Sequence, residues 1–255
     1  MYGMPNTSQN SDRTLPWHMV VEAVAPHIVR VSTPRGSGTG FLLGRSPSGK
    51  FTGIATAAHV IADSHYWREP IRIEHYSSKE VLYLEHKDRG IIVEANTDSA
   101  AIVFDTPKLA LPEQPLNLIA QGRVMKVGAE VGWMGFPANA QGNLCFFGGR
   151  ISCSMEEWNA YLLDGVVING VSGGPVIFPG GGDGVFKIVG AVSAYRPNWA
   201  TGSALPGLGV ATSLASFYSA ITQISNLKDA ESEPIAPSPL APQPEPPQTP
   251  ANTRI

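Results

Sequence analysis

Positive charge, cysteine and long apolar runs are all scarce in this sequence. Charged residues make up 15% of its 255 residues and the formal net charge is −3, a mildly acidic balance that indicates no nucleic-acid or anionic-membrane partner. No apolar run reaches the ~18 residues of a membrane-spanning helix, and residues 1–14 lack the apolar core of a signal peptide. With two cysteines in addition, we expect a cytoplasmic protein with reduced thiols.

Histidine is absent from the chain after position 86, and this absence orders the candidate catalytic groups. The serine of interest is Ser172, which lies in the glycine-rich segment 169–175 between the apolar runs 166–168 and 176–178. A serine hydroxyl needs a base and an orienting group to act as a nucleophile, and neighbouring glycines let backbone N–H groups face a developing oxyanion. All six histidines precede Ser172: His18, His27, His59, His65, His75 and His86.

The order of these groups argues against two common serine-hydrolase arrangements. Residues 170–174 fit the G-x-S-x-G elbow of α/β-hydrolases, but that fold places its histidine after the serine. The subtilisin order needs an aspartate before the histidine, and only Asp12, in a polar stretch, precedes His59. The order histidine, aspartate, serine remains. Asp98 fits it best, because it opens an apolar run, whereas Asp88 lies in a charged run and Asp105 ends a strand.

Three motifs built on these residues resemble those of the trypsin-like (chymotrypsin-fold) serine peptidases. T-A-A-H at 56–59 matches the histidine motif of that family, D-S-A-A-I at 98–102 matches its aspartate motif more loosely, and G-x-S-G-G-P at 170–175 matches its serine motif. The entry near residues 20–31 and G-F-P at 135–137 resemble bacterial HtrA-type (Deg-type) peptidase domains. The resemblance covers about residues 20–228, and we expect no PDZ-like domain after it, which departs from typical HtrA-type proteins.

The resemblance implies an all-β fold of two six-stranded antiparallel β-barrels with a short C-terminal helix. The 27 glycines and the many short apolar runs independently favour strands over helices, although 17–24 can form two helical turns with Thr14 as a candidate N-cap. The expected divisions are a flexible N-terminus (1–16), a peptidase domain (17–228) with barrels at about 27–106 and 116–212 and a closing helix at about 213–227, and a disordered tail (229–255).

The resemblance also assigns roles in the site. Ser172 would be the nucleophile, His59 the general base and Asp98 the group that orients His59, while the N–H groups of Gly170 and Ser172 would form the oxyanion hole. Alignment on the serine motif places the floor of the specificity pocket at Val166 and its wall at Ser193, Ala194 and Tyr195. An apolar floor predicts cleavage after small or medium apolar residues of a peptide substrate. No cofactor or metal is required.

Several other patterns have ordinary structural interpretations. His75 and His86 each follow a glutamate, but without H-E-x-x-H spacing or a cysteine pair we expect solvated sheet faces and no zinc. The glycine-rich segment 36–40 lacks the ending of a phosphate-binding loop. Gly148-Gly149 could be a hairpin turn or part of one bent strand, and neither alternative favours a disulfide between Cys145 and Cys153.

The tail has a composition of its own. Eight of the 22 prolines lie within 234–255, with four P-x-x-P matches, which predicts an extended, disordered segment. It could be a tether or a ligand for a proline-binding partner. Beside a free-standing endopeptidase, two further functions stay open: a catalytically silent or latent peptide-binding module, and a regulatory protease arm recruited to a larger system by this tail.

Overall fold

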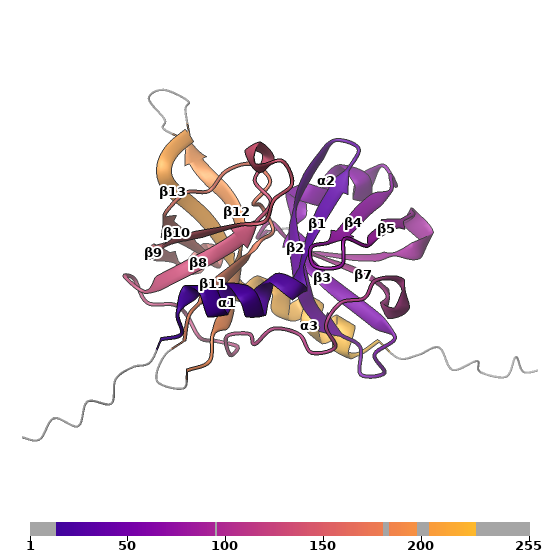
Figure 1. The fold of residues 1–255 in the computed structure, drawn as a ribbon, viewed down its shortest axis with the longest axis horizontal. Coiled ribbons are helices and arrows are strands. Elements are labelled where there is room, and N and C mark those ends of the chain that lie inside the picture. The colour runs from indigo at the N-terminus through magenta and orange to yellow at the C-terminus, as the bar shows by residue number, and fades with distance from the viewer. Residues whose placement is uncertain (1–13, 95, 181–183, 198–203, 228–255) are drawn as a thin grey trace, which may run out of the picture.

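The fold consists of two antiparallel β-sheets side by side, with short helices along their junction (Figure 1). The computed structural model describes residues 14–94, 96–180, 184–197 and 204–227, of which 195–197 and 204–206 are described by their backbone alone. The expected flexible N-terminus lies almost wholly outside the described residues, as does the proline-rich tail. No helix of the described part is long and apolar enough to cross a membrane.

The N-terminal half is a seven-stranded sheet. Its strands pair in the order β5-β4-β1-β2-β3-β7-β6, every pair antiparallel. Alternate side chains of these strands bury an apolar cluster that includes Val31, Leu42, Ile54 and Ile102. The strands are β1 (Ile28–Thr33), β2 (Gly36–Arg45), β3 (Phe51–Ala57), β4 (Ile71–His75), β5 (Val81–Leu84), β6 (Gly90–Glu94) and β7 (Ser99–Asp105).

The C-terminal half is a closed barrel of six strands in the order β10-β13-β12-β11-β8-β9. Trp133, Tyr161 and Val189 belong to its apolar interior. Before β8, Leu118 makes an isolated bridge with Ile188. The strands are β8 (Glu130–Gly135), β9 (Cys145–Met155), β10 (Ala160–Asp164), β11 (Pro175–Phe178), β12 (Lys187–Pro197) and β13 (Ala204–Ser213).

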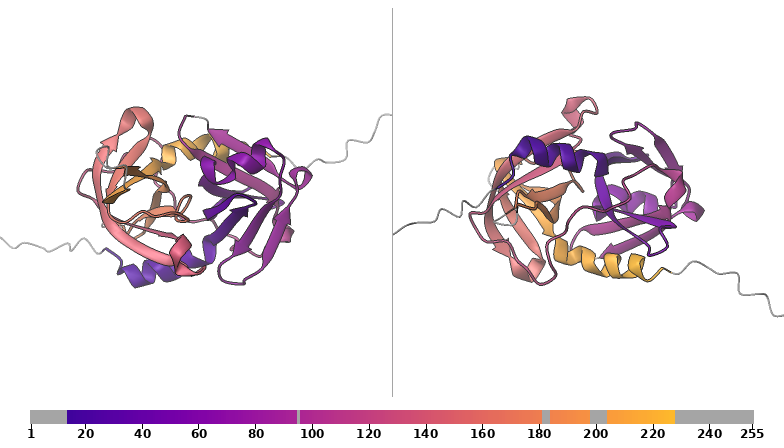
Figure 2. Two further views of the ribbon diagram at one scale, coloured as in Figure 1. Left: turned by 90° about the horizontal axis from the view of Figure 1, so that it is seen from above. Right: turned by 60° about the horizontal axis from the view of Figure 1, so that its bottom comes forward.

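The helices lie mainly where the two sheets meet (Figure 2). In α1 (Trp17–Val24), Val20 and Val24 are fully buried in a cluster that also contains Phe41 of β2, Phe136 after β8 and Phe217. This shared cluster fixes one half of the molecule against the other. The remaining helices are α2 (Ala58–Tyr66), α3 (Tyr218–Ser225) and the 3-10 turns η1 (Ala25–His27), η2 (His86–Asp88), η3 (Thr106–Lys108), η4 (Ala138–Ala140), η5 (Glu156–Trp158) and η6 (Leu214–Phe217).

The prediction of a double-barrel, all-β fold with a short closing helix is confirmed. The N-terminal half has seven strands instead of six, and they form an open sheet, so among the described residues only the C-terminal half is a closed barrel. The expected helix at 17–24 is present, but its N-cap is Pro16 and not Thr14. Gly148 and Gly149 lie within the single strand β9, so the hairpin alternative is wrong, and both cysteines are free.

His75 also differs from expectation, because it is buried and not on a solvated face. Its side chain is 4% exposed, and both ring nitrogens are engaged, Nδ1 with Ser78 Oγ at 2.9 Å and Nε2 with the Pro26 carbonyl at 2.8 Å. It therefore holds the chain before β1 against the end of β4. His86 is exposed, as expected, but lies in η2.

Candidate active site

His59 and Asp98 are brought together by the register of two neighbouring strands. Ala57, the last residue of β3, pairs with Ser99, the first residue of β7. The residues that follow Ala57 therefore meet the residue that precedes Ser99. His59 is the second residue of α2, which begins directly after β3, and its side chain is half-exposed.

Asp98 also caps the helix that carries His59. The N–H of Ala58 donates to the Asp98 carbonyl at 3.0 Å, and the N–H of His59 donates to Asp98 Oδ1 at 2.9 Å. These donors have no partner inside the helix, and Ala57 at the N-cap position has no side-chain acceptor. The backbone of Asp98 takes up the left-handed conformation, with φ of 48°, to make both contacts.

The side chains of His59 and Asp98 lie within hydrogen-bonding distance of each other, as in an ion pair. His59 Nδ1 lies 2.9 Å from Asp98 Oδ2 and 3.1 Å from Oδ1. The hydrogen bond to Asp98 raises the pKa of His59 above its usual value, outweighing partial burial, which acts in the opposite direction. Burial alone would raise the pKa of Asp98, but hydrogen bonds from the His59 ring, Ser193 and the His59 N–H lower it on balance. The carboxylate is therefore ionised at neutral pH, and the imidazole is an enhanced base.

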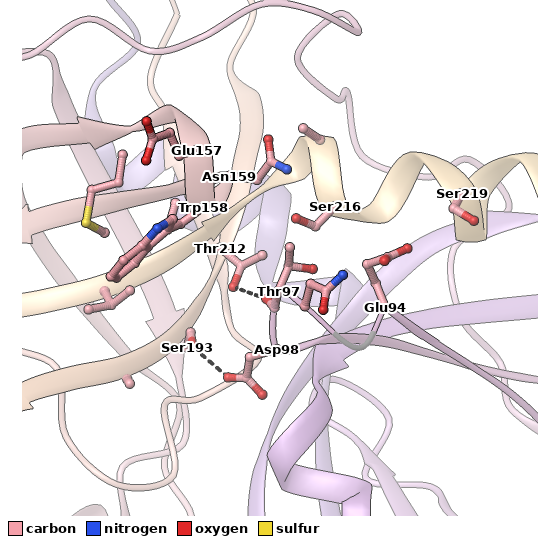
Figure 3. A pocket seen from close by; sticks show the side chains of 16 residues that line it. Glu94, Thr97, Asp98, Glu157, Trp158, Asn159, Ser193, Thr212, Ser216 and Ser219 are labelled. Carbon is pink, nitrogen blue, oxygen red and sulfur yellow. Dashed lines mark hydrogen bonds between the residues drawn. The ribbon is translucent and has the colours of Figure 1, made fainter.

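The C-terminal half holds the turn of Asp98 from the other side (Figure 3). Ser193 Oγ donates to Asp98 Oδ2 at 2.5 Å, and Thr212 Oγ1 donates to the Thr97 carbonyl at 2.8 Å. Ser193 is buried, with 8% of its surface exposed. Of the residues predicted to form the specificity wall, Ser193 thus contacts the carboxylate itself.

The turn of Ser172 is packed against the strands that lead to His59. The Ser172 carbonyl accepts a hydrogen bond from the Thr39 N–H at 2.8 Å. A Cβ on Gly173 would lie 2.1 Å from the Thr39 carbonyl oxygen and 2.9 Å from the Ala57 nitrogen, so glycine is required at this contact as well as by its φ of 85°. Gly173 also donates its N–H to the Val192 carbonyl at 2.7 Å, which places Ser172 beside β12.

The hydroxyl of Ser172 is turned toward Ser193. Ser172 Oγ donates to the Ser193 carbonyl at 3.2 Å. The hydrogen bonds among the described residues include none between Ser172 Oγ and His59 Nε2.

Two backbone N–H groups beside Ser172 are held in place by the carbonyls of the same peptide units. The Asn169 carbonyl accepts from Ala138 at 2.9 Å, and the Val171 carbonyl accepts from Gly174 at 2.9 Å. In a trans peptide the N–H and the carbonyl point in opposite directions. The N–H of Gly170 therefore points away from Ala138, and the N–H of Ser172 points away from the N–H of Gly174. No backbone carbonyl of the described chain accepts from either N–H.

Thr39 connects these parts and was not identified from the sequence as a site residue. It is fully buried in β2, in the segment interpreted as structural because of its glycines. Thr39 Oγ1 donates to the Gly170 carbonyl at 2.8 Å and accepts from the Phe136 N–H at 3.0 Å, while its own carbonyl accepts from Thr56 Oγ1 at 2.8 Å. The signal in the sequence was a polar residue between two glycines, Gly38 and Gly40.

The other predicted pocket residues are only partly described. The Val166 side chain is 50% exposed, and its carbonyl accepts from the Trp133 indole at 3.0 Å. Ala194 is exposed and lines a cavity beside Asp98. The side chain of Tyr195 lies outside the described residues, although its backbone belongs to β12. Within the described part of the chain no group of three or more histidine, cysteine or acidic residues is arranged to hold a metal.

Comparison with known proteins supports this architecture. No family model and no curated protein sequence matches the chain. Rv3671c from M. tuberculosis H37Rv is similar in structure: the inactive form of a serine-to-alanine mutant has a TM-score of 0.55 at 20% identity over 87% of this chain and 95% of that one. The inactive form of the Rv3671c protease has a TM-score of 0.54 at 21% identity, over 80% and 92%.

A serine endoprotease from Yersinia pestis gives a TM-score of 0.60 at 20% identity, covering 84% of this chain and 68% of that one. These similarities show a shared fold. The chain has the double-barrel fold of the trypsin-like serine peptidases.

Proposed function

We propose that this protein is a serine endopeptidase that hydrolyses peptide bonds through His59, Asp98 and Ser172. The observation that carries the proposal is the double contact of Asp98 with His59. One carboxylate accepts from the backbone N–H of His59 and lies against its Nδ1, so the helix, the ring and the tautomer are fixed together. A second supporting observation is that the turn containing Ser172 packs against the end of β3, the strand that leads to His59.

The proposed reaction has two stages, acylation of the serine and hydrolysis of the acyl-enzyme. The Ser172 hydroxyl turns from the Ser193 carbonyl to His59, Nε2 takes its proton, and Oγ attacks the carbonyl carbon of the substrate. The N–H groups of Gly170 and Ser172 stabilise the resulting oxyanion. The C–N bond then breaks as His59 returns the proton to the leaving amine, and water hydrolyses the acyl-enzyme by the same route in reverse. Asp98 stays ionised and stabilises the imidazolium in each step.

We further propose that the residue before the cleaved bond is small or medium and apolar. Val166 supports this by the alignment of the serine motif. It also lies in a segment held by the indole of Trp133, which is fully buried. Replacing Val166 with aspartate should shift the preference toward lysine and arginine, measured with peptides that vary only at that position. An unchanged preference would remove Val166 from the pocket.

Hydrolysis of a peptide library tests the proposal directly. Wild type should cleave the peptides and Ser172→Ala should not. The matched control is Ser48→Ala, which removes the hydroxyl of a serine that lies in a turn and is distant from Ser172 in the sequence. Equal cleavage by wild type and Ser172→Ala would refute the assignment of the nucleophile.

The contact between Ser172 Oγ and the Ser193 carbonyl favours a second candidate, a peptide-binding module that is catalytically silent or latent. In that case labelled peptides would bind to the wild-type protein without being cut. Comparison of binding and cleavage on the same peptides separates the two functions.

A further inference from the structure

A cavity of about 880 Å³ opens next to the candidate active site and shares Asp98 and Ser193 with it. It lies between the two halves of the molecule (Figure 3). Glu94 and Thr97 line it from the N-terminal sheet, and Glu157 and Trp158 line it from η5 of the C-terminal barrel. Because it adjoins Asp98 and Ser193, the cavity is next to the position of the cleaved bond in the proposed reaction.

The charged residues that line the cavity are all acidic. Asp98 is paired with His59, whereas Glu94 and Glu157 form no ion pair within the described part of the chain. No described lysine or arginine lines the cavity. Glu94 and Glu157 therefore line the cavity from the two halves of the molecule, without a described lysine or arginine beside them (Figure 3).

The remaining lining adds an aromatic surface and an unused hydroxyl. Trp158 is 60% exposed, a large fraction for an indole, and its ring lies above Ser193 in Figure 3. Ser216 is 8% exposed, and its Oγ has no hydrogen-bond partner. In Figure 3 this hydroxyl is turned toward the space between Thr97 and Asn159. A buried hydroxyl is ordinarily paired, so this one points to a donor that the ligand would bring.

We infer that this cavity is a subsite for a lysine or arginine side chain of the peptide substrate, at a position away from the cleaved bond. Such a side chain has several N–H donors and no acceptor, which matches carboxylates and a free hydroxyl. Its aliphatic stem packs on an indole, and its cationic head interacts favourably with aromatic rings. The inference rests on the proposed function, because that function supplies the peptide.

The test uses decapeptides with one central apolar residue, in which a single lysine or glutamine is moved through every other position. Binding is measured by fluorescence anisotropy on Ser172→Ala, so that the result does not depend on turnover, and cleavage is measured on wild type. One position should favour lysine over glutamine by about tenfold, the effect of one charge-assisted hydrogen bond. This preference should weaken as salt rises.

Glu157→Gln and Glu94→Gln should reduce the preference at that position toward unity. Glu156→Gln is the matched control, because it makes the same charge change on a neighbouring exposed residue that does not line the cavity, and it should leave the preference intact. The subsite is overturned if no position favours lysine, or if both cavity variants keep the wild-type preference. Selective binding without cleavage would leave the subsite standing and refute the peptidase.

Discussion

Replacement of Thr39 with valine tests the link between the buried core and the proposed oxyanion site at Gly170 and Ser172. Valine keeps the shape of threonine but removes Oγ1, which donates to the Gly170 carbonyl and accepts from the Phe136 N–H. The N–H of Thr39 still holds the Ser172 carbonyl. The change therefore releases Gly170 while leaving the serine turn in place.

The magnitude follows from two buried backbone groups that lose their partner. Each unsatisfied group costs about 1–3 kcal/mol, so the free energy of unfolding should fall by about 2–6 kcal/mol. Gly170 sits at φ of 92° and would lose one of its two anchors, the other being the bond between Asn169 and Ala138. Loss of one oxyanion donor lowers kcat by ~10²–10³-fold, which is the upper limit of the expected effect.

The assay is steady-state peptide hydrolysis at a temperature where chemical denaturation shows the variant to be folded. The control is Thr39→Ser, which keeps the hydroxyl and loses only a methyl group. We expect kcat to fall in Thr39→Val with little change in KM, and to stay near wild type in Thr39→Ser. If folded Thr39→Val has the kcat of Thr39→Ser, Thr39 does not position the oxyanion site.

Three further predictions concern the same site. Asp98→Asn should keep the left-handed turn and an oxygen to cap α2, yet lower kcat by ~10⁴-fold, because the amide favours the wrong tautomer of His59; activity near wild type would show that Asp98 has no orienting role. Because Asp98 raises the pKa of His59, and the base must be neutral, kcat/KM should fall as pH drops through a value above the ordinary ~6.5. A midpoint at or below 6.5 in this activity profile would contradict the pairing. The same pair contributes to the free energy of unfolding: the contribution of His59 is fully present below its unfolded pKa and is lost as pH rises through its folded pKa. The contribution of Asp98 is present above its unfolded pKa of about 3.9 and is lost as pH falls through its lower folded pKa. Gly170→Ala would place a Cβ 2.2 Å from the Phe136 carbonyl oxygen at a positive φ, so activity should be lost in a protein that thermal denaturation shows to be destabilised, and retained activity would exclude this backbone from the oxyanion site.

The chain order of a few chemical groups carried most of the prediction. The absence of histidine after position 86 left one order of base, acid and nucleophile, and the structure brings His59 and Asp98 into contact. Glycine and short apolar runs correctly favoured strands. The contact between His59 and Asp98 was thus predictable from the sequence alone.

Residues whose role depends on distant partners could not be recognised in this way. Thr39 contacts Gly170 across 131 positions, and nothing in its neighbourhood indicates this bond. His75 was expected on a solvated face of an alternating strand, but it is buried. Burial is possible because Ser78 and the Pro26 carbonyl form hydrogen bonds with its two ring nitrogens. The cavity of Glu94, Glu157 and Trp158 forms only when segments from both halves meet. Such sites depend on which distant segments pack together, and the pattern of a single sequence does not indicate this.

Labelling with a fluorophosphonate tests the central claim most directly, because this reagent reacts only with a serine that is activated by an assembled site. The protein should be labelled at Ser172, as located by mass spectrometry of its peptides. His59→Ala should abolish the labelling, and Glu156→Gln should leave it unchanged. A wild-type protein that is folded but not labelled, or labelled at a different residue, would contradict the assignment of Ser172, His59 and Asp98 as a catalytic triad.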